Sequence, residues 1–323
     1  MLTRLKTNTS LSLVGLTIMI AVAANVFSGG SRVDAKGPLA SSERRLTAVE
    51  HDATLAGVGT IPLLLEAAIM LTVTSSSDAV NGDVSSATSL NARPGPDGIS
   101  LREAILATNA TEGAETIYIA FAPTMAGQTI SLGPHLPGVR RDHVTIIGLL
   151  SAEGQPSVTI DARQASNSPR VDYMLFVQAS HVTIRQLRFT GVAWEGTGFA
   201  IGIAPGNAVP QYPPGPQRIS DVRVEDNLFD NRGFDFPRGG PRAGGINIHT
   251  TGFPPNKQVA RVTIARNVFL NYSGNAPGVS LSGDASSVME VTVRENRFER
   301  IDCCAIEFSA PGGAQQGARM PRS

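Results

Sequence analysis

Four polar residues in the last part of the chain are of the types that sugar chemistry requires. Asn247 and His249 alternate with isoleucines, and Glu307 lies in a similar alternating stretch shortly after Asp302. Hydrolysis of a glycosidic bond needs two carboxyl groups near that bond, and a histidine can exchange a proton near neutral pH. His249, Asp302 and Glu307 are therefore candidate catalytic residues, and Asn247 is a candidate substrate-binding residue. A single histidine on a strand is, however, more often a solvated polar residue than a general base.

Four further candidates for substrate binding lie in irregular segments rich in glycine and proline. Trp194 could stack on a sugar ring, and Tyr212 lies in a proline-rich stretch. Arg238 and Arg242 belong to a long segment between residues 231 and 244. Segments of this length could wall a groove, although ordinary surface decoration is the preferred interpretation.

A short sequence motif, called the repeated phrase below, recurs four times between residues 181 and 309. It predicts the strands that position these side chains. The copies begin at Val182, Val222, Val262 and Val291. In each copy two apolar residues flank one outward residue, which is the alternation of a short strand. A phenylalanine follows at a constant distance, and the four are Phe189, Phe229, Phe269 and Phe298. We therefore expect a second strand after a fixed bend and a stack of aromatic rings inside.

A third apolar pair follows each copy after a gap of variable length. The four pairs are Ile201/Ile203, Ile246/Ile248, Val279/Leu281 and Ile306/Phe308. Three short strands in each repeat predict an all-β fold, with the coils of a parallel β-helix solenoid over residues 143–309. Equivalent positions should then form columns, with Gly202, Asn247, Ser280 and Glu307 in one outward column. Ala204, His249, Ser282 and Ser309 should form a second.

Polar residues at the bend between the first two strands have a structural interpretation. Asn227, Asn267 and Asn296 recur at one position, where we expect left-handed backbone geometry and hydrogen bonds from coil to coil. The preceding residues alternate in charge and would form an ionic ladder: Gln186, Asp226, Arg266 and Glu295. These residues are better explained by building the solenoid than by a binding site.

The first part of the chain divides into three predicted regions. Residues 1–35 have a basic start and then an uncharged apolar run, which is typical of an export signal, with an uncleaved membrane anchor as the alternative. Residues 36–68 read as a poorly defined linker. Residues 69–142 contain strands and one helix that begins at Ser100, where Ser100 and Glu103 form a capping box.

The segment around that helix resembles a known bacterial family. Leu71–Thr74, Asp97–Ile105 and Thr116–Phe121 are similar to the N-terminal segment of secreted and surface proteins that carry a CSLREAI motif, with Ile99 in place of its cysteine. The resemblance implies a right-handed parallel β-helix of the pectin-lyase-like type with a short N-terminal capping α-helix. Because the family is mostly of unassigned activity, the resemblance says little about chemistry.

Calcium-assisted sugar lyases of this fold need several carboxylates on adjacent coils, and no predicted column offers three. We therefore predict no cofactor and leave calcium open.

Charge and cysteine content narrow the classes of partner. Lys and Arg together number 27, and Asp and Glu together also number 27, so nothing indicates a nucleic-acid partner.

The two cysteines, Cys303 and Cys304, are adjacent, and strand alternation should point them apart, with Cys304 inward and Cys303 outward. Residues 310–323 read as a disordered tail with no helix to cover the last coil, which suggests either a truncated member of a longer family or end-to-end self-association.

Three functions fit these observations. The first is a secreted or cell-surface protein that binds extracellular polysaccharide or cell-surface glycan without catalysis. The second is a polysaccharide lyase or glycoside hydrolase that uses the candidate catalytic residues. The third is a structural surface fragment with no small ligand. A membrane would be involved only through an uncleaved N-terminal segment.

Overall fold

The computed structural model describes residues 68–164, 173–192, 198–205, 215–232, 243–250, 258–283, 288–309 and 316–318. All of them belong to one compact unit, Leu63–Ser323, and a second unit, Met1–Pro62, lies outside the described residues. The predicted export signal and most of the predicted linker therefore also lie outside them. No helix in the described ranges is long and apolar enough to cross a membrane.

The described residues form mainly β-strands in three sheets. Sheet 1 contains β1 (Ala68–Val73), β2 (Thr116–Phe121), β4 (Val144–Ile147), β7 (Val182–Arg185), β10 (Arg218–Ser220), β11 (Arg223–Glu225), β14 (Gln258–Ala265) and β17 (Val288–Arg294). Sheet 2 contains β3 (Thr129–Ser131), β5 (Val158–Asp161), β8 (Leu187–Thr190), β12 (Leu228–Asp230), β15 (Val268–Tyr272) and β18 (Arg297–Ile301). Sheet 3 contains β6 (Tyr173–Val177), β9 (Gly198–Ile203), β13 (Ala243–His249), β16 (Val279–Ser282), β19 (Ile306–Ser309) and β20 (Gln316–Ala318).

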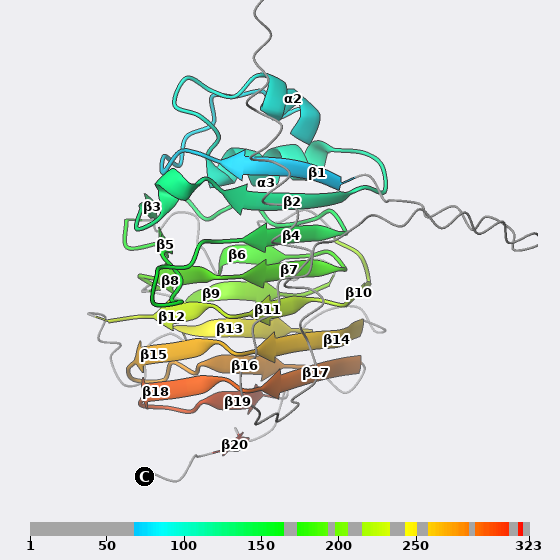
Figure 1. The fold of residues 1–323 in the computed structure, drawn as a ribbon. Helices are drawn as coiled ribbons and strands as arrows, with labels where there is room; N and C mark the ends of the chain where they lie inside the picture. Colours follow the sequence, from blue (N-terminus) through cyan, green and yellow to red (C-terminus); the bar gives the residue numbers. More distant parts are fainter. Residues whose placement is uncertain are drawn as a thin grey trace, which may run out of the picture. The chain divides into compact units, whose positions relative to one another are not determined.

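The chain visits the three sheets in turn and then repeats the circuit. Strands β7, β8 and β9 make one circuit, and β14, β15 and β16 make a later one. Apart from the antiparallel pair β19–β20, the named strands pair in parallel with their equivalents in the neighbouring circuits. Figure 1 shows these strands stacked in layers. The arrangement confirms an all-β fold with parallel sheets and is compatible with a parallel β-helix.

The interior confirms the predicted phenylalanine stack. Phe189, Phe229, Phe269 and Phe298 lie in register in sheet 2, with ring centroids 5.2, 4.7 and 4.9 Å apart and nearly parallel planes. Two glycines in sheet 3 make room for these rings. A Cβ atom on Gly245 would lie 2.6 Å from the ring of Phe269, and one on Gly278 would lie 2.6 Å from the ring of Phe298. The aromatic stack therefore requires glycine at these two positions.

The asparagine ladder is also confirmed, with one correction. Asn267 donates through Nδ2 to the carbonyl oxygen of Val224 (2.8 Å), and its Oδ1 accepts from the backbone N–H of Asn227 (3.0 Å). The predicted left-handed geometry of the asparagines is wrong, because positive φ angles occur one residue earlier. Those residues are Gln186, Asp226, Arg266 and Glu295, with φ between 55° and 60°. The left-handed residue turns the chain and points to solvent, which leaves the next side chain buried in the corner.

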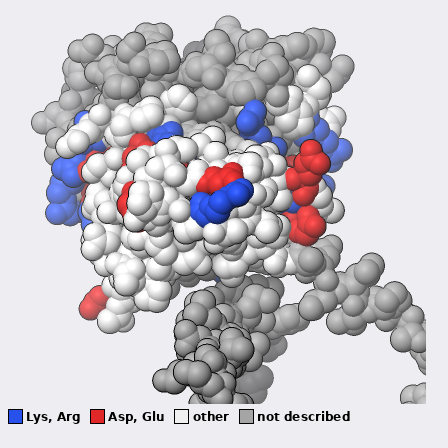
Figure 2. Space-filling model, turned by 90° about the horizontal axis from the view of Figure 1, so that it is seen from above, with Lys and Arg blue, Asp and Glu red and all other residues white. Residues whose placement is uncertain are grey.

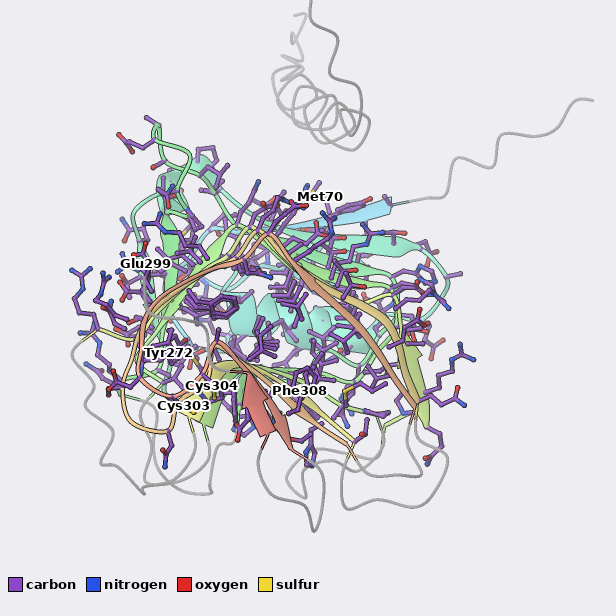
Figure 3. The ribbon with its side chains drawn as sticks, turned by 90° about the horizontal axis from the view of Figure 1, so that it is seen from below. Met70, Tyr272, Glu299, Cys303, Cys304 and Phe308 are labelled. Carbon is purple, nitrogen blue, oxygen red and sulfur yellow. The ribbon has the colours of Figure 1, made fainter. Side chains whose placement is uncertain are left out.

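The N-terminal helix α3 (Leu101–Ala110) begins with the predicted capping box. Glu103 is buried, and its carboxylate accepts from the backbone N–H groups of Ser100, Asn81 and Gly82. These bonds hold the pKa of Glu103 below its usual range, although burial opposes them. The view along the stack in Figure 3 shows α3 across the interior that the sheets enclose. The helix α2 (Ala87–Ala92) and the 3₁₀ turn η1 (Pro123–Met125) were not predicted.

The final circuit is more exposed than those before it. Phe269 is fully buried, whereas Phe298 and Ile301 are half-buried. Phe308 on β19 is 52% exposed. Strand β20 lies within the predicted tail and pairs antiparallel with β19, which the sequence did not predict.

Candidate functional site

The outer face of sheet 3 collects most of the predicted site residues that the structure describes. Ile246 and Ile248 are fully buried in the interior, so strand alternation turns Asn247 and His249 to the other face. The register places Asn247 opposite Gly202 and Ser280, and Ser280 opposite Glu307. His249 pairs with Ser282, which pairs with Ser309. The first predicted column is therefore confirmed in register from β9 to β19, and the second from β13 to β19.

Three aromatic residues adjoin the first column on the same face. Tyr173, Phe176 and Phe199 form a buried cluster with Ala204, separate from the main core. The ring of Tyr173 stacks on Phe176 (centroids 5.0 Å apart, planes at 16°) and is tilted against Phe199 (6.4 Å, 34°). A Cβ atom on Gly202 would lie 2.3 Å from the Tyr173 ring. Gly202 therefore lets the tyrosine ring lie directly over the sheet.

Asn247 connects the polar column to this aromatic cluster. Its Nδ2 donates a hydrogen bond to the hydroxyl of Tyr173 at 3.0 Å. Its Oδ1 is buried and has no hydrogen-bond partner, and the residue exposes only 8% of its surface. A buried acceptor without a partner is costly and uncommon in native proteins, so it needs an explanation. A hydroxyl or N–H group of a ligand would satisfy it.

The three predicted catalytic residues do not converge in the structure. Glu307 is 4% exposed on β19, whereas Asp302 is exposed in the turn before that strand. The carboxylate of Asp302 accepts a hydrogen bond from the backbone N–H of Gly274 at 3.3 Å, so it supports the turn of the preceding circuit. His249 is half-buried. It lies two residues after Asn247 on β13, so it belongs to the second column and not to the column that contains Asn247 and Glu307.

The four predicted residues in irregular segments fall outside the part of the chain that the structure describes. These are Trp194, Tyr212, Arg238 and Arg242. Sequence reasoning missed Tyr173, Phe176 and Phe199. A signal was available, because β6 reads Tyr-Met-Leu-Phe-Val with no polar residue. A strand that lacks alternation is buried on both faces, which here predicts a covered outer surface.

A second polar column lies on the outer face of sheet 2 and corrects the prediction that no column holds three carboxylates. Its register runs through Ser131, Asp161, Thr190, Asp230, Leu270 and Glu299. Its carboxylates are used within the fold: Arg163 pairs with Asp161, and Arg188 pairs with Asp230 at 2.8 Å.

Asp230 also accepts from Asn271 at 2.6 Å. Burial, together with the Asp230 carboxylate, raises the pKa of Tyr272 far above its ordinary value. These groups form a structural network, so the outer face of sheet 3 is the better candidate site.

Among the described residues, neither charged groups nor metal-ligating groups form a second candidate site. The described residues contain no group of three or more His, Cys, Asp or Glu that could hold a metal ion. Figure 2 shows small groups of acidic and basic side chains scattered over a mostly uncharged face. That face therefore offers no continuous basic surface.

Comparison with known proteins identifies no family and no relative of this chain. No protein-family model, no curated protein and no solved structure matches this chain.

Proposed function

We propose that this chain is a right-handed parallel β-helix protein, covered at its N-terminal end by α3, that binds a polysaccharide on the outer face of sheet 3. The circuit of three parallel sheets and the repeated phrase support the β-helix. The basic start and the apolar run of residues 1–35 support export, so the partner is an extracellular polysaccharide or a cell-surface glycan.

The observation that carries the proposal is the pairing of an aromatic cluster with an unsatisfied amide. Sugars present apolar C–H faces and hydroxyl donors in alternation. The rings of Tyr173 and Phe199 form a buried apolar cluster beside Asn247, whose Oδ1 is a buried acceptor without a partner. Binding sites commonly combine aromatic surface with a few precisely placed polar groups.

Binding without catalysis fits the carboxylates better than turnover does. Hydrolysis requires two carboxyl groups on either side of one bond. Glu307 is buried in the sheet 3 column, whereas Asp302 is exposed and supports a turn. A lyase or hydrolase is the alternative, and a structural surface protein without a small ligand is a third outcome of the test.

The test is a binding measurement on matched tyrosine and asparagine variants. The full chain would be titrated with polygalacturonate, alginate, xylan and mixed-linkage β-glucan by calorimetry. Asn247→Ala should weaken binding about 10-fold, which is the value of one hydrogen bond to a buried group. Tyr173→Phe should weaken it several-fold, because it frees Nδ2 and loosens the amide. Tyr118→Phe is the matched control, since Tyr118 is a half-buried tyrosine on β2 of sheet 1.

Each outcome selects one function. Equal binding by the Asn247→Ala variant and the native chain would place the ligand elsewhere and refute the proposed site. Release of unsaturated uronate or reducing sugar that is abolished in Glu307→Gln would replace the binding function with the enzymatic one. Neither binding nor turnover on any polysaccharide would favour the structural role.

A further inference from the structure

The turn between β18 and β19 brings the chain's two cysteines together. The Sγ atoms of Cys303 and Cys304 lie 2.6 Å apart, and both side chains are thiols in this structure. The prediction that strand alternation points them apart is wrong, because the pair lies in a turn. Figure 3 shows both cysteines beside Tyr272.

Backbone hydrogen bonds hold this turn against the preceding circuit on both sides of the pair. Asp302 donates its N–H to the carbonyl oxygen of Tyr272 at 2.9 Å. On the other side, the carbonyl of Cys304 accepts from the N–H of Gly278 at 3.2 Å. The two thiols therefore face each other on an anchored stretch of backbone.

The spacing of the pair favours a reversible bond rather than a structural one. An S–S bond is about 2.05 Å long, so little side-chain movement separates the thiols from bonding. Adjacent Cα atoms are about 3.8 Å apart across a trans peptide, which is shorter than the 4.4–6.8 Å usual for disulfides. Strain of this kind makes a disulfide easier to reduce, and labile disulfides are typically regulatory or catalytic.

The two thiols differ in access, which gives them different roles. Cys303 is half-buried, and Cys304 exposes 8% of its surface. An external reagent therefore reaches Cys303 first, and Cys304 can act only on a sulfur that is already bound to Cys303. This is the arrangement of an attacking thiol and a resolving thiol.

We propose that Cys303 and Cys304 form a redox-active dithiol that exchanges with small extracellular disulfides. The Cys303 thiolate attacks one sulfur of a disulfide RSSR, which forms a Cys303–S–S–R bond and releases RS⁻. The Cys304 thiolate then attacks Cys303 Sγ, which closes the Cys303–Cys304 bond and releases the second RS⁻. The two thiol protons end on the two released thiolates. The protein loses two electrons and two protons, and RSSR is reduced to two RSH.

Equilibration in glutathione buffers tests the exchange. The full chain would be incubated at a series of ratios of oxidised to reduced glutathione, quenched with acid, and weighed intact. A monomer that has lost two hydrogens should accumulate as the buffer becomes more oxidising and should revert when it becomes more reducing. In Cys304→Ser, a glutathione adduct on Cys303 should accumulate instead. Stable glutathione adducts on the native chain, or disulfide-linked dimers as the main product, would refute the proposal.

A trivalent arsenical provides an independent measure of the distance between the thiols. Phenylarsine oxide binds two neighbouring thiols, with formation of two As–S bonds and loss of water. The reduced native chain should take up one equivalent. Either Cys303→Ser or Cys304→Ser should weaken uptake on the order of 100-fold, since the second bond is lost. Equal uptake by the native chain and the single variants would show that the thiols act separately and would overturn the proposal. A near-ultraviolet spectrum shared by the native chain and both variants is the control for folding.

Discussion

Two buried asparagines show how differently this molecule uses the same side chain. Asn267 lies at the corner between sheets 1 and 2 and is 0% exposed, and Asn247 lies on the outer face of sheet 3 and is 8% exposed. Both groups of the Asn267 amide are paired with neighbouring circuits, including Asn296 Oδ1 at 3.0 Å. The Asn247 amide has one partner, Tyr173, and its oxygen has none.

The contrast separates an asparagine that links neighbouring circuits from one whose acceptor oxygen has no partner. A fully paired buried amide fixes the distance and register between circuits, and its loss leaves backbone groups without partners. The Asn247 amide has one hydrogen-bond partner, so we expect it to contribute less to stability than the Asn267 amide does. The same distinction applies to aromatic residues, because the Phe269 stack lies inside and the Tyr173 cluster lies outside.

The largest expected effect is the removal of a central ring from the interior stack. Phe269→Ala should lower the free energy of unfolding by about 3–5 kcal/mol, because it leaves a cavity between Phe229 and Phe298. Phe298→Ala should cost roughly half as much, since Phe298 is half-buried in the last circuit. Urea unfolding of both variants measures the difference. Equal losses would mean that the last circuit is as well covered as the inner ones.

The next effect concerns the paired asparagine. Asn267→Ala should lower the free energy of unfolding by about 2–4 kcal/mol, because the backbone N–H of Asn227 and the carbonyl of Val224 both lose a buried partner. Urea unfolding again provides the measurement. A loss below about 1 kcal/mol would show that water replaces the ladder and that the ladder does not hold the circuits together.

The unsatisfied asparagine should behave differently under the same substitution. Asn247→Ala should change the free energy of unfolding by no more than about 1 kcal/mol, because it removes one hydrogen bond to Tyr173 and one orphan acceptor. Its effect should appear in glycan binding instead. A loss of stability as large as that of Asn267→Ala would make Asn247 a structural residue and remove the contrast.

The smallest expected effect comes from the ion pair between Arg261 on β14 and Asp221, which lies between β10 and β11. Hydrogen bonds from Arg261 lower the pKa of Asp221 from 3.8 to about 2, although partial burial opposes them. Because the folded-state pKa is depressed, the carboxylate stabilises the fold above pH 3.8 and loses this contribution as the pH falls through about 2. Asp221→Asn should cost less than about 1 kcal/mol at neutral pH. Unfolding of the variant and the native chain between pH 7 and pH 2 should converge toward the acid end; a constant difference would contradict the assignment.

Most of the fold was predictable, because strand alternation is a local property. The repeated phrase identified the strands of all three sheets in the later circuits, the interior phenylalanines and the columns of sheet 3. The capping box at Ser100 located α3. The backbone conformation at the bend was assigned one residue too late, because asparagine adopts left-handed geometry more readily than Gln186, Arg266 or Glu295, the types that adopt it here. Their roles differ only because neighbouring circuits bury one side chain and leave the other exposed.

The sequence by itself determined which residues face the interior and which face outward, because side chains alternate along every strand. Only the tertiary structure decided which partners the outward residues have. It showed that Asp230 is already paired with Arg188, that Asn247 adjoins Tyr173 across a long stretch of chain, and that two adjacent thiols meet in a turn. These relations depend on the lateral packing of separate circuits and on turn geometry, which periodicity along one strand does not encode.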